Sequence, residues 1–285
     1  MKIDTIDTTG AGHIGDTPQE EKNMQSVINA LDTLFNKRDY EAVRQLWSPD
    51  YVQRSLWVPP GKEGLFNMVP TIPTTMRLEF NRAVANDDVV FVHCRTSGQG
   101  APPFVSGDWF RIKDGLFVEH WDVMQNEVSE KESLSKRPMY GEAAMREPNG
   151  PGQSDPQQSN ANKTLAIEAF DTLFNKRDFA AAEKYWSPQF VQHSALTPPG
   201  REGLFNQVKS MPKLRYEFGL AMASKSLVVL HGRVTGNGKS RADIVANIMQ
   251  LQDGVFVEHW DVVMPEATKE EANGRSPMWG DTFPA

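Results

Sequence analysis

Apolar side chains recur at helical spacing near the start of each half of the chain. Between residues 24 and 35 they follow a period of three to four residues, and residues 167–174 repeat the later part of this pattern. Asp39 and Asp178 follow these runs at positions suited to cap a second, shorter helix. Each half is therefore expected to begin with two helices.

The remainder of each half alternates between apolar and polar residues. Residues 214–222 place apolar side chains at every second position, as a half-buried strand does, and three further apolar runs follow. An Asp-Gly pair, Asp114-Gly115 or Asp253-Gly254, separates the last two runs of each half and predicts a tight hairpin. Helices followed by an antiparallel sheet indicate the α+β class.

The two halves are copies of one another. Segment 31–67 reappears with substitutions at 170–206, an offset of 139 residues (170 − 31), and GLFVEHWDVM at 115–124 returns as GVFVEHWDVV at 254–263. This period has the length of one domain and is too long for a solenoid repeat. Polar stretches rich in Gly, Pro and Ser or Thr lie outside the repeated parts. The expected organisation is a disordered tail at 1–20, a first domain at 21–145, a linker at 146–162 and a second domain at 163–285.

Composition and charge exclude some classes of partner. The net charge of −7 gives no reason to expect binding to nucleic acid or anionic membranes, and a 39% hydrophobic share is ordinary for a globular protein. The one cysteine, Cys94, excludes an internal disulfide and agrees with a reducing compartment. No apolar run has the length of a membrane span, and the chain does not start with a secretion signal. A cytoplasmic location is expected.

Two shared motifs point to a known family. Each half carries Pro-Pro-Gly-(Lys/Arg)-Glu-Gly-Leu after its first strand and Asp-Gly-x-Phe-Val-Glu-His-Trp-Asp-Val near its end. This order resembles the SnoaL-like polyketide cyclase branch of the nuclear transport factor 2-like superfamily, over nearly all of both repeats. The resemblance implies two cone-shaped α+β barrels, each with a curled antiparallel sheet around helices. Related single domains commonly pair through their sheets, so we expect an intrachain pseudo-dimer that is a 32 kDa monomer, or a multiple of it, in solution.

The last strand of each half has two chemically different faces. Alternate residues of a strand share a face, so a His and an Asp point one way and the Trp between them points the other. The Trp face, Trp121 or Trp260, is expected to be buried in an interface or core rather than to contact a cofactor. The His and Asp face either looks into a pocket or forms a structural hydrogen bond at its rim. The four residues on this face are His120, Asp122, His259 and Asp261.

The resemblance also implies site residues in the first half. Asp108 matches the position of a general acid/base in related cyclases, and His93 matches the family's pocket histidine. A buried carboxylate beside an imidazole suits proton transfer, although the same pair could be a satisfied polar plug of the barrel. Gln53 and Gln192 could orient a substrate carbonyl, or they are ordinary strand-end residues.

The copies diverge at these positions. Copy 1 has Arg54 where the family pattern has a histidine, whereas copy 2 keeps His193 there. Copy 2 has Asn247 where copy 1 has its aspartate, and an amide cannot accept a proton at neutral pH. His231 remains in copy 2, with the His and Asp of its last strand, so that half is expected to be structural or ligand-binding. Copy 1 is the expected catalytic half.

No motif for another chemistry is present in the sequence. It has no zinc-binding or nucleotide-binding motif, and the His-x-Asp pairs have no obvious third ligand nearby, so neither metal nor cofactor is expected. The expected function is a cofactor-independent acid/base reaction on a small, largely apolar carbonyl compound, such as a cyclisation, an aldol-type cleavage or an isomerisation. The alternative is a non-catalytic module of the same fold, for small-molecule binding or assembly.

Overall fold

The computed structural model describes residues 12–141 and 155–284. Apart from a short strand at the start of the first half, both halves begin with two helices, and their long antiparallel strands follow later, as expected. The first half contains β1 (Gly12–Gly15), α1 (Pro18–Leu31) with a π-helical turn (Asp32–Lys37), α2 (Tyr40–Arg44), β2 (Trp47–Gln53), α3 (Gly61–Met68) with a 3-10 turn (Val69–Thr71), β3 (Arg77–Asn86), β4 (Val89–Ser97), β5 (Phe104–Lys113) and β6 (Leu116–Asn126). The second half contains α4 (Pro156–Phe170) with a π-helical turn (Asp171–Lys176), α5 (Phe179–Ala182) with a 3-10 turn (Glu183–Tyr185), β7 (Trp186–Gln192), α6 (Gly200–Ser210), β8 (Arg215–Ser224), β9 (Leu227–Thr235), β10 (Asp243–Gln252), β11 (Val255–Pro265) and α7 (Lys269–Ala272).

Local signals fix the ends of several elements as expected. The Asp39 side chain accepts from the Ala42 N–H at the start of α2, and Asp178 does the same for Ala181 at the start of α5. In the hairpin between β5 and β6, Asp114 and Gly115 both have positive φ, 52° and 79°. A two-residue turn of this kind matches the twist of the flanking strands.

Two expected boundaries are wrong in part. Residues 12–20 were assigned to the disordered tail, yet β1 pairs in parallel with β3, and α1 starts at Pro18 behind a capping box made by Thr17 and Glu20. The assigned linker also overlaps α4, which starts at Pro156 because Asp155 caps it. Residues 1–11 and 142–154 lie outside the described residues.

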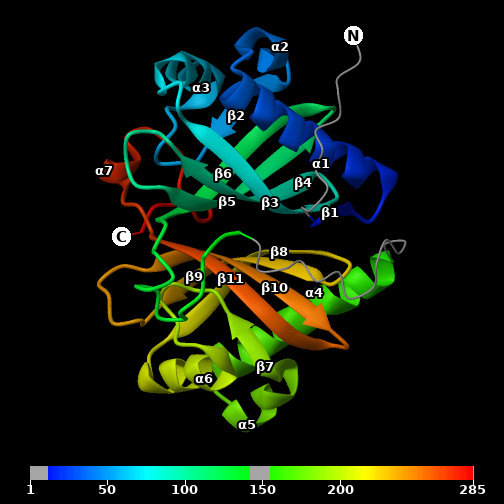
Figure 1. Ribbon diagram of the computed structural model, residues 1–285, viewed down its shortest axis with the longest axis vertical. Coiled ribbons are helices and arrows are strands. Elements are labelled where there is room, and N and C mark those ends of the chain that lie inside the picture. The colour runs from blue at the N-terminus through cyan, green and yellow to red at the C-terminus, as the bar shows by residue number, and fades with distance from the viewer. Residues whose placement is uncertain (1–11, 142–154, 285) are drawn as a thin grey trace.

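Each half forms one curled sheet. The first has the strand order β1-β3-β4-β5-β6-β2, and the second has β7-β11-β10-β9-β8. Figure 1 shows the two sheets face to face at the centre, with the helices of each half on the outer sides. The fold class is therefore confirmed as two cone-shaped α+β domains. No helix within the described residues combines the length and apolar character needed to cross a membrane.

The facing sheets share one apolar core. Trp109, Trp121 and Trp260 are buried in it together with aliphatic residues of both halves. The Asn86 side chain donates to the Ala223 carbonyl (2.9 Å) and accepts from its N–H (2.7 Å), so backbone polar groups at the contact are also paired. The intrachain pseudo-dimer and the packing role of the tryptophans are confirmed.

The segments that follow the two sheets cross to the opposite half. We call residues 127–141 the first tail and residues 266–284 the second tail. In the first tail, the Leu134 N–H donates to the Ala195 carbonyl of copy 2 (3.0 Å). In the second tail, Arg275 Nε donates to the Val58 carbonyl of copy 1 (2.7 Å), and this red segment lies beside the first half in Figure 1. The tail of each half is thus hydrogen-bonded to the other half.

Candidate functional site

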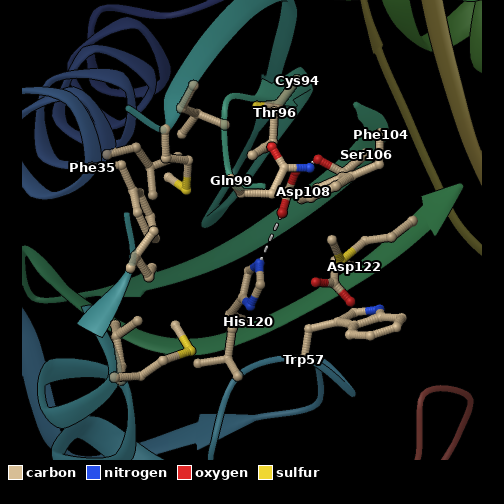
Figure 2. A pocket seen from close by; sticks show the side chains of 18 of the residues that line it. Phe35, Trp57, Cys94, Thr96, Gln99, Phe104, Ser106, Asp108, His120 and Asp122 are labelled. Atoms are coloured by element: carbon tan, nitrogen blue, oxygen red, sulfur yellow. Dashed lines mark hydrogen bonds and ion pairs between the residues drawn. The ribbon is translucent and has the colours of Figure 1, made fainter. Parts of the chain in front are cut away.

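A cavity of about 500 Å³ lies inside the first barrel. Its walls are mostly apolar, and they come from the helices on one side and from strands β3 to β6 on the other. A few polar side chains gather on its sheet side (Figure 2). Such a cavity suits a small, largely apolar molecule that is oriented by few polar contacts. The polar lining residues central to the site are Gln53, Ser106, Asp108, His120 and Asp122.

The register of β5 and β6 brings the three ionisable groups together. Asp108 lies directly opposite Asp122, and His120 shares the inner face because it is two residues away on the same strand. Trp109 and Trp121 occupy the other face and pack in the shared core. In copy 1, the His and Asp of the last strand therefore line the cavity.

Hydrogen bonds fix where His120 carries its proton. Gln53 Oε1 accepts from the Ser55 N–H (2.9 Å), which identifies that atom as the amide oxygen. The same oxygen lies 2.8 Å from His120 Nδ1, so Nδ1 must be the donor. His120 Nε2 then faces Asp108 Oδ1 at 3.3 Å, and the Ser106 hydroxyl donates to Asp108 Oδ2 (2.7 Å). One proton can be shared between Nε2 and the Asp108 carboxyl.

Asp122 stands in a different electrostatic setting. Burial raises the pKa of Asp122 to about 6, and the nearby Asp108 charge adds to the rise, while His120 and a hydrogen bond from Ser55 oppose it. One carboxyl oxygen of Asp122 is buried and has no hydrogen-bond partner. Three side chains each place one possible metal-ligand atom within 4.8 Å of the others: Asp108, His120 and Asp122. The sequence showed no third ligand beside His120 and Asp122, and in the structure Asp108 lies in that position.

His93 does not assist Asp108, and this expectation is corrected. In the pairing of β4 with β5, Val92 lies opposite Asp108 and His93 lies opposite Gly107. His93 therefore points away from the cavity, toward Arg82 and Tyr140. Its neighbour Cys94 lines the cavity instead, and burial raises the pKa of this thiol well above its usual range, which keeps it protonated.

Arg54 and His193 are also not pocket residues. Arg54 donates to Glu119 (2.7 Å) and to the Pro277 carbonyl of the second tail (2.9 Å). His193 occupies the matching position, with Nε2 at 2.8 Å from Glu258 and Nδ1 at 2.9 Å from the Pro138 carbonyl of the first tail. Both side chains bind a tail, because the residue after each short strand turns outward from the barrel.

Copy 2 repeats the polar arrangement with one change. His259 Nδ1 lies 2.8 Å from Gln192 Oε1, and His259 Nε2 lies 3.1 Å from the Asn247 side chain. Asn247 also donates to the Tyr216 hydroxyl (2.9 Å). Burial lowers the pKa of His259 to about 3 and raises that of Asp261 to about 7. Asn247 therefore belongs to a neutral, hydrogen-bonded group.

Tyr216 fills the interior of the second barrel. Its ring lies so close to Gly232 that a Cβ added there would be 2.1 Å from the Tyr216 hydroxyl oxygen. Copy 1 has Leu78 and Cys94 at the matching positions, and both line its cavity. His231 was expected in the second pocket but lies in the shared core beside Trp109 and Trp279. The second site is built on the same plan, with an aromatic ring in the space that is open in the first.

Sequence reasoning missed Ser106, the cavity-lining Trp57 and the Tyr216–Gly232 pair. Ser106 could have been found, because it precedes Asp108 by two residues on a strand and so shares its face. The closeness of Tyr216 and Gly232 depends on the pairing of β8 with β9, which no local pattern reveals.

One family model matches both halves of the chain. The sequence model of the SnoaL-like domain matches residues 28–120 and again 167–259. No curated protein matches the chain. Similar solved structures include a candidate polyketide cyclase from Bacillus cereus ATCC 10987, with 17% identity and a TM-score of 0.37, covering 44% of this chain and 92% of that one. A candidate ketosteroid isomerase from Kribbella flavida has 18% identity and a TM-score of 0.35, covering 39% of this chain and 83% of that one. An NTF2-like protein of unknown function from Cytophaga hutchinsonii has 10% identity and a TM-score of 0.33, covering 36% of this chain and 89% of that one.

Proposed function

Both halves of this chain belong to the family of SnoaL-like domains, and we propose that the cavity of the first half transfers a proton next to a carbonyl group of a small, largely apolar molecule. Asp108 and His120 are the proposed acid/base pair. The proposal rests on the cluster in copy 1, where a carboxylate and an imidazole of fixed tautomer face each other in an apolar cavity.

The hydrogen-bond chain suggests how the two groups divide the chemistry. Because Nδ1–H is committed to Gln53, the shared proton either rests on Nε2 or on Asp108. When Nε2 holds it, Asp108 is a carboxylate and can take a proton from the carbon next to the substrate carbonyl. The Nε2–H can then donate to the enolate oxygen that forms. Returning the proton from Asp108 to another carbon completes an isomerisation. In an aldol-type closure the enolate carbon instead attacks a second carbonyl, and the alkoxide that forms takes the proton from Asp108.

The polar surroundings support this division of roles. The Ser106 hydroxyl holds one Asp108 oxygen at 2.7 Å and leaves the other directed at His120. Gln53 is itself oriented by the Ser55 N–H, so the imidazole is held by a backbone-anchored chain. An orienting group of this kind keeps a catalytic imidazole in one tautomer during the reaction.

Deuterium exchange tests the proposal without a known substrate. Ketones that contain one aromatic ring and are small enough for the cavity, such as 2-tetralone and acetophenone, are incubated with the protein in D2O. Loss of the proton signal next to the carbonyl is followed by NMR. Asp108→Asn should slow exchange about 10²- to 10⁴-fold, since it removes the group that accepts the proton. Asp261→Asn, in the filled second barrel, is the matched control and should leave the rate unchanged.

Two results would contradict the proposal. Full exchange by Asp108→Asn would show that another group accepts the proton. Binding of such ketones without any exchange above the solvent rate would favour the non-catalytic binding module instead.

A further inference from the structure

The second tail holds both ends of the segment that closes one side of the cavity, residues 54–58, which we call the entrance segment. We propose that Arg275 positions Trp57 of this segment over the bound substrate, so that the second half completes the substrate site of the first. Trp57 is then a binding residue, and Arg275 is a positioning residue that acts through it. The inference rests on the proposed function in that it assumes an apolar ligand in this cavity.

The contacts at the two ends of the entrance segment come from different residues of the second tail. At one end, Arg54 Nη1 donates to the carbonyls of Pro277 (2.9 Å) and Gly280 (3.0 Å). At the other end, Arg275 Nε donates to the Val58 carbonyl (2.7 Å), and Arg275 Nη1 donates to Ala272 (3.1 Å) within its own tail. Charge-assisted hydrogen bonds of this length are stronger than neutral ones. The entrance segment is therefore held by the opposite half at both ends.

The middle of the entrance segment is joined to the acid/base cluster. Ser55 is fully buried, its N–H donates to Gln53 Oε1 (2.9 Å), and its side chain bonds to Asp122. The Ser55 hydroxyl also accepts from the Trp57 N–H (3.2 Å). A movement of Val58 or Trp57 is thus connected through Ser55 to the groups that orient His120.

Trp57 has the properties of a residue that a ligand covers. It lines the cavity, yet 65% of its surface is exposed, the largest exposure among the exposed large hydrophobic residues that the structure describes. Figure 2 shows the indole beside Asp122, on the cavity side of the entrance segment. An apolar molecule in the cavity can bury this ring, and burial of an indole is worth a large share of the binding free energy of a small ligand.

The pseudo-symmetry of the chain supplies a matched control. Lys136 of the first tail occupies the position of Arg275, at the same offset of 139 (275 − 136). Its Nζ donates to the Lys131 carbonyl in its own tail. Lys136→Ala therefore removes a cation at the equivalent place without touching the first cavity.

The test uses the neutral dye Nile red as the probe of the cavity, in the full-length protein. Leu78→Tyr with Cys94→Gly imports the filling of the second barrel and should abolish dye binding, which locates the site. Trp57→Ala and Arg275→Ala should each raise the Kd of the dye about fivefold or more, and Lys136→Ala should not. When Trp57→Ala and Arg275→Ala are combined, the rise in Kd should equal that of Trp57→Ala alone, because Arg275 acts through the indole. Arg275→Lys keeps one donor and should restore part of the affinity.

The inference would be overturned if Trp57→Ala and Arg275→Ala raised the Kd of the dye independently of each other. It would also be overturned if Arg275→Ala and Lys136→Ala changed the Kd equally. Melting curves of each variant check that a change in Kd does not reflect unfolding. Dye binding requires no proton transfer, so a failure of the acid/base proposal in the deuterium-exchange assay would leave this result unaffected, and the reverse also holds.

Discussion

The carboxyl of Asp261 shows what burial does to a single group. It is buried in the second barrel, where burial raises its pKa to about 7 and a hydrogen bond from Ser194 opposes the rise. Between about pH 4 and pH 7 the unfolded chain ionises this carboxyl while the folded protein keeps it protonated. The folded state therefore loses stability from this group as the pH rises through that range.

Asp261→Asn should remove this loss. At pH 8 we expect the variant to be more stable than the parent by up to about 4 kcal/mol, because a shift of about three pKa units is released. At pH 4 the difference should vanish. Urea unfolding at several pH values measures it, with the exposed Asp50→Asn as control. A stability difference that does not change with pH would contradict this assignment of the shift.

At the level of single residues, the sequence predicts some directions well and others not. Alternation in the last strand correctly separated His120 and Asp122 from Trp121. The same rule gave no help for His93, because residues 89–94 are buried on both faces of β4, one in the barrel and one in the shared core. When a strand is apolar on both faces, its sequence does not show which residues face the barrel. Only the pairing of β4 with β5 shows that Cys94 faces the cavity.

At the level of elements, the same strands leave a cavity in one copy and place a tyrosine ring in the matching space of the other. The difference lies on β8 and β9, where Tyr216 packs against Gly232, while Leu78 and Cys94 leave room on β3 and β4. Divergence at Asn247 was visible in the sequence. The Tyr216 ring that accompanies it gives no distinct sequence signal, since Tyr in a strand is ordinary and its contact with a glycine is set by register.

Tyr216→Leu should open the second barrel. Removing the ring leaves a cavity, so we expect a loss of about 2 to 4 kcal/mol in the free energy of unfolding and a second bound Nile red molecule per chain. Fluorescence titration gives the stoichiometry, and the parent should bind one molecule. A stoichiometry that stays at one in a folded Tyr216→Leu variant would show that other side chains close this barrel.

The tails and the extra first strand could not be predicted from the chain pattern. Neither tail shows a sustained helical or alternating pattern of apolar residues, although each adds a methionine, Met139 or Met278, to the shared core. The start of α4 was hidden for a similar reason. Its first turns contain Gln, Ser and Asn, a composition that is also typical of a linker. The signals for a helix start there are the N-cap Asp155 and the following Pro156.

At the level of the whole molecule, the two halves meet across a very close contact. Gly107 of β5 faces its own counterpart Ala246 of β10, and a Cβ at Gly107 would lie 2.8 Å from the Ala246 Cβ and 2.9 Å from the Phe91 ring. Real Cβ atoms do not approach this closely. The glycine is therefore required by the approach of the other half.

Gly107→Ala should push the halves apart and destabilise the chain by about 1 to 3 kcal/mol. Exchanging the pair, with Gly107→Ala and Ala246→Gly together, should recover part of this loss, because one of the two short contacts is removed. Thermal unfolding of the single, reciprocal and double variants measures the coupling. Additive effects would show that these positions do not meet across the interface.

Arg82 is a buried cation in this shared core, with its guanidinium 3.5 Å from the Trp260 ring, and the matching residue of the second half is Leu220. In a dimer of two identical subunits, both subunits have the same sequence, so every substitution occurs on both sides of the twofold axis. Arg82 would then bring two desolvated guanidinium groups into one core, at a cost that a single one does not incur. Joining the two copies in one chain removes this constraint: each half can carry a substitution that would be destabilising if it were repeated across the pseudo-twofold axis.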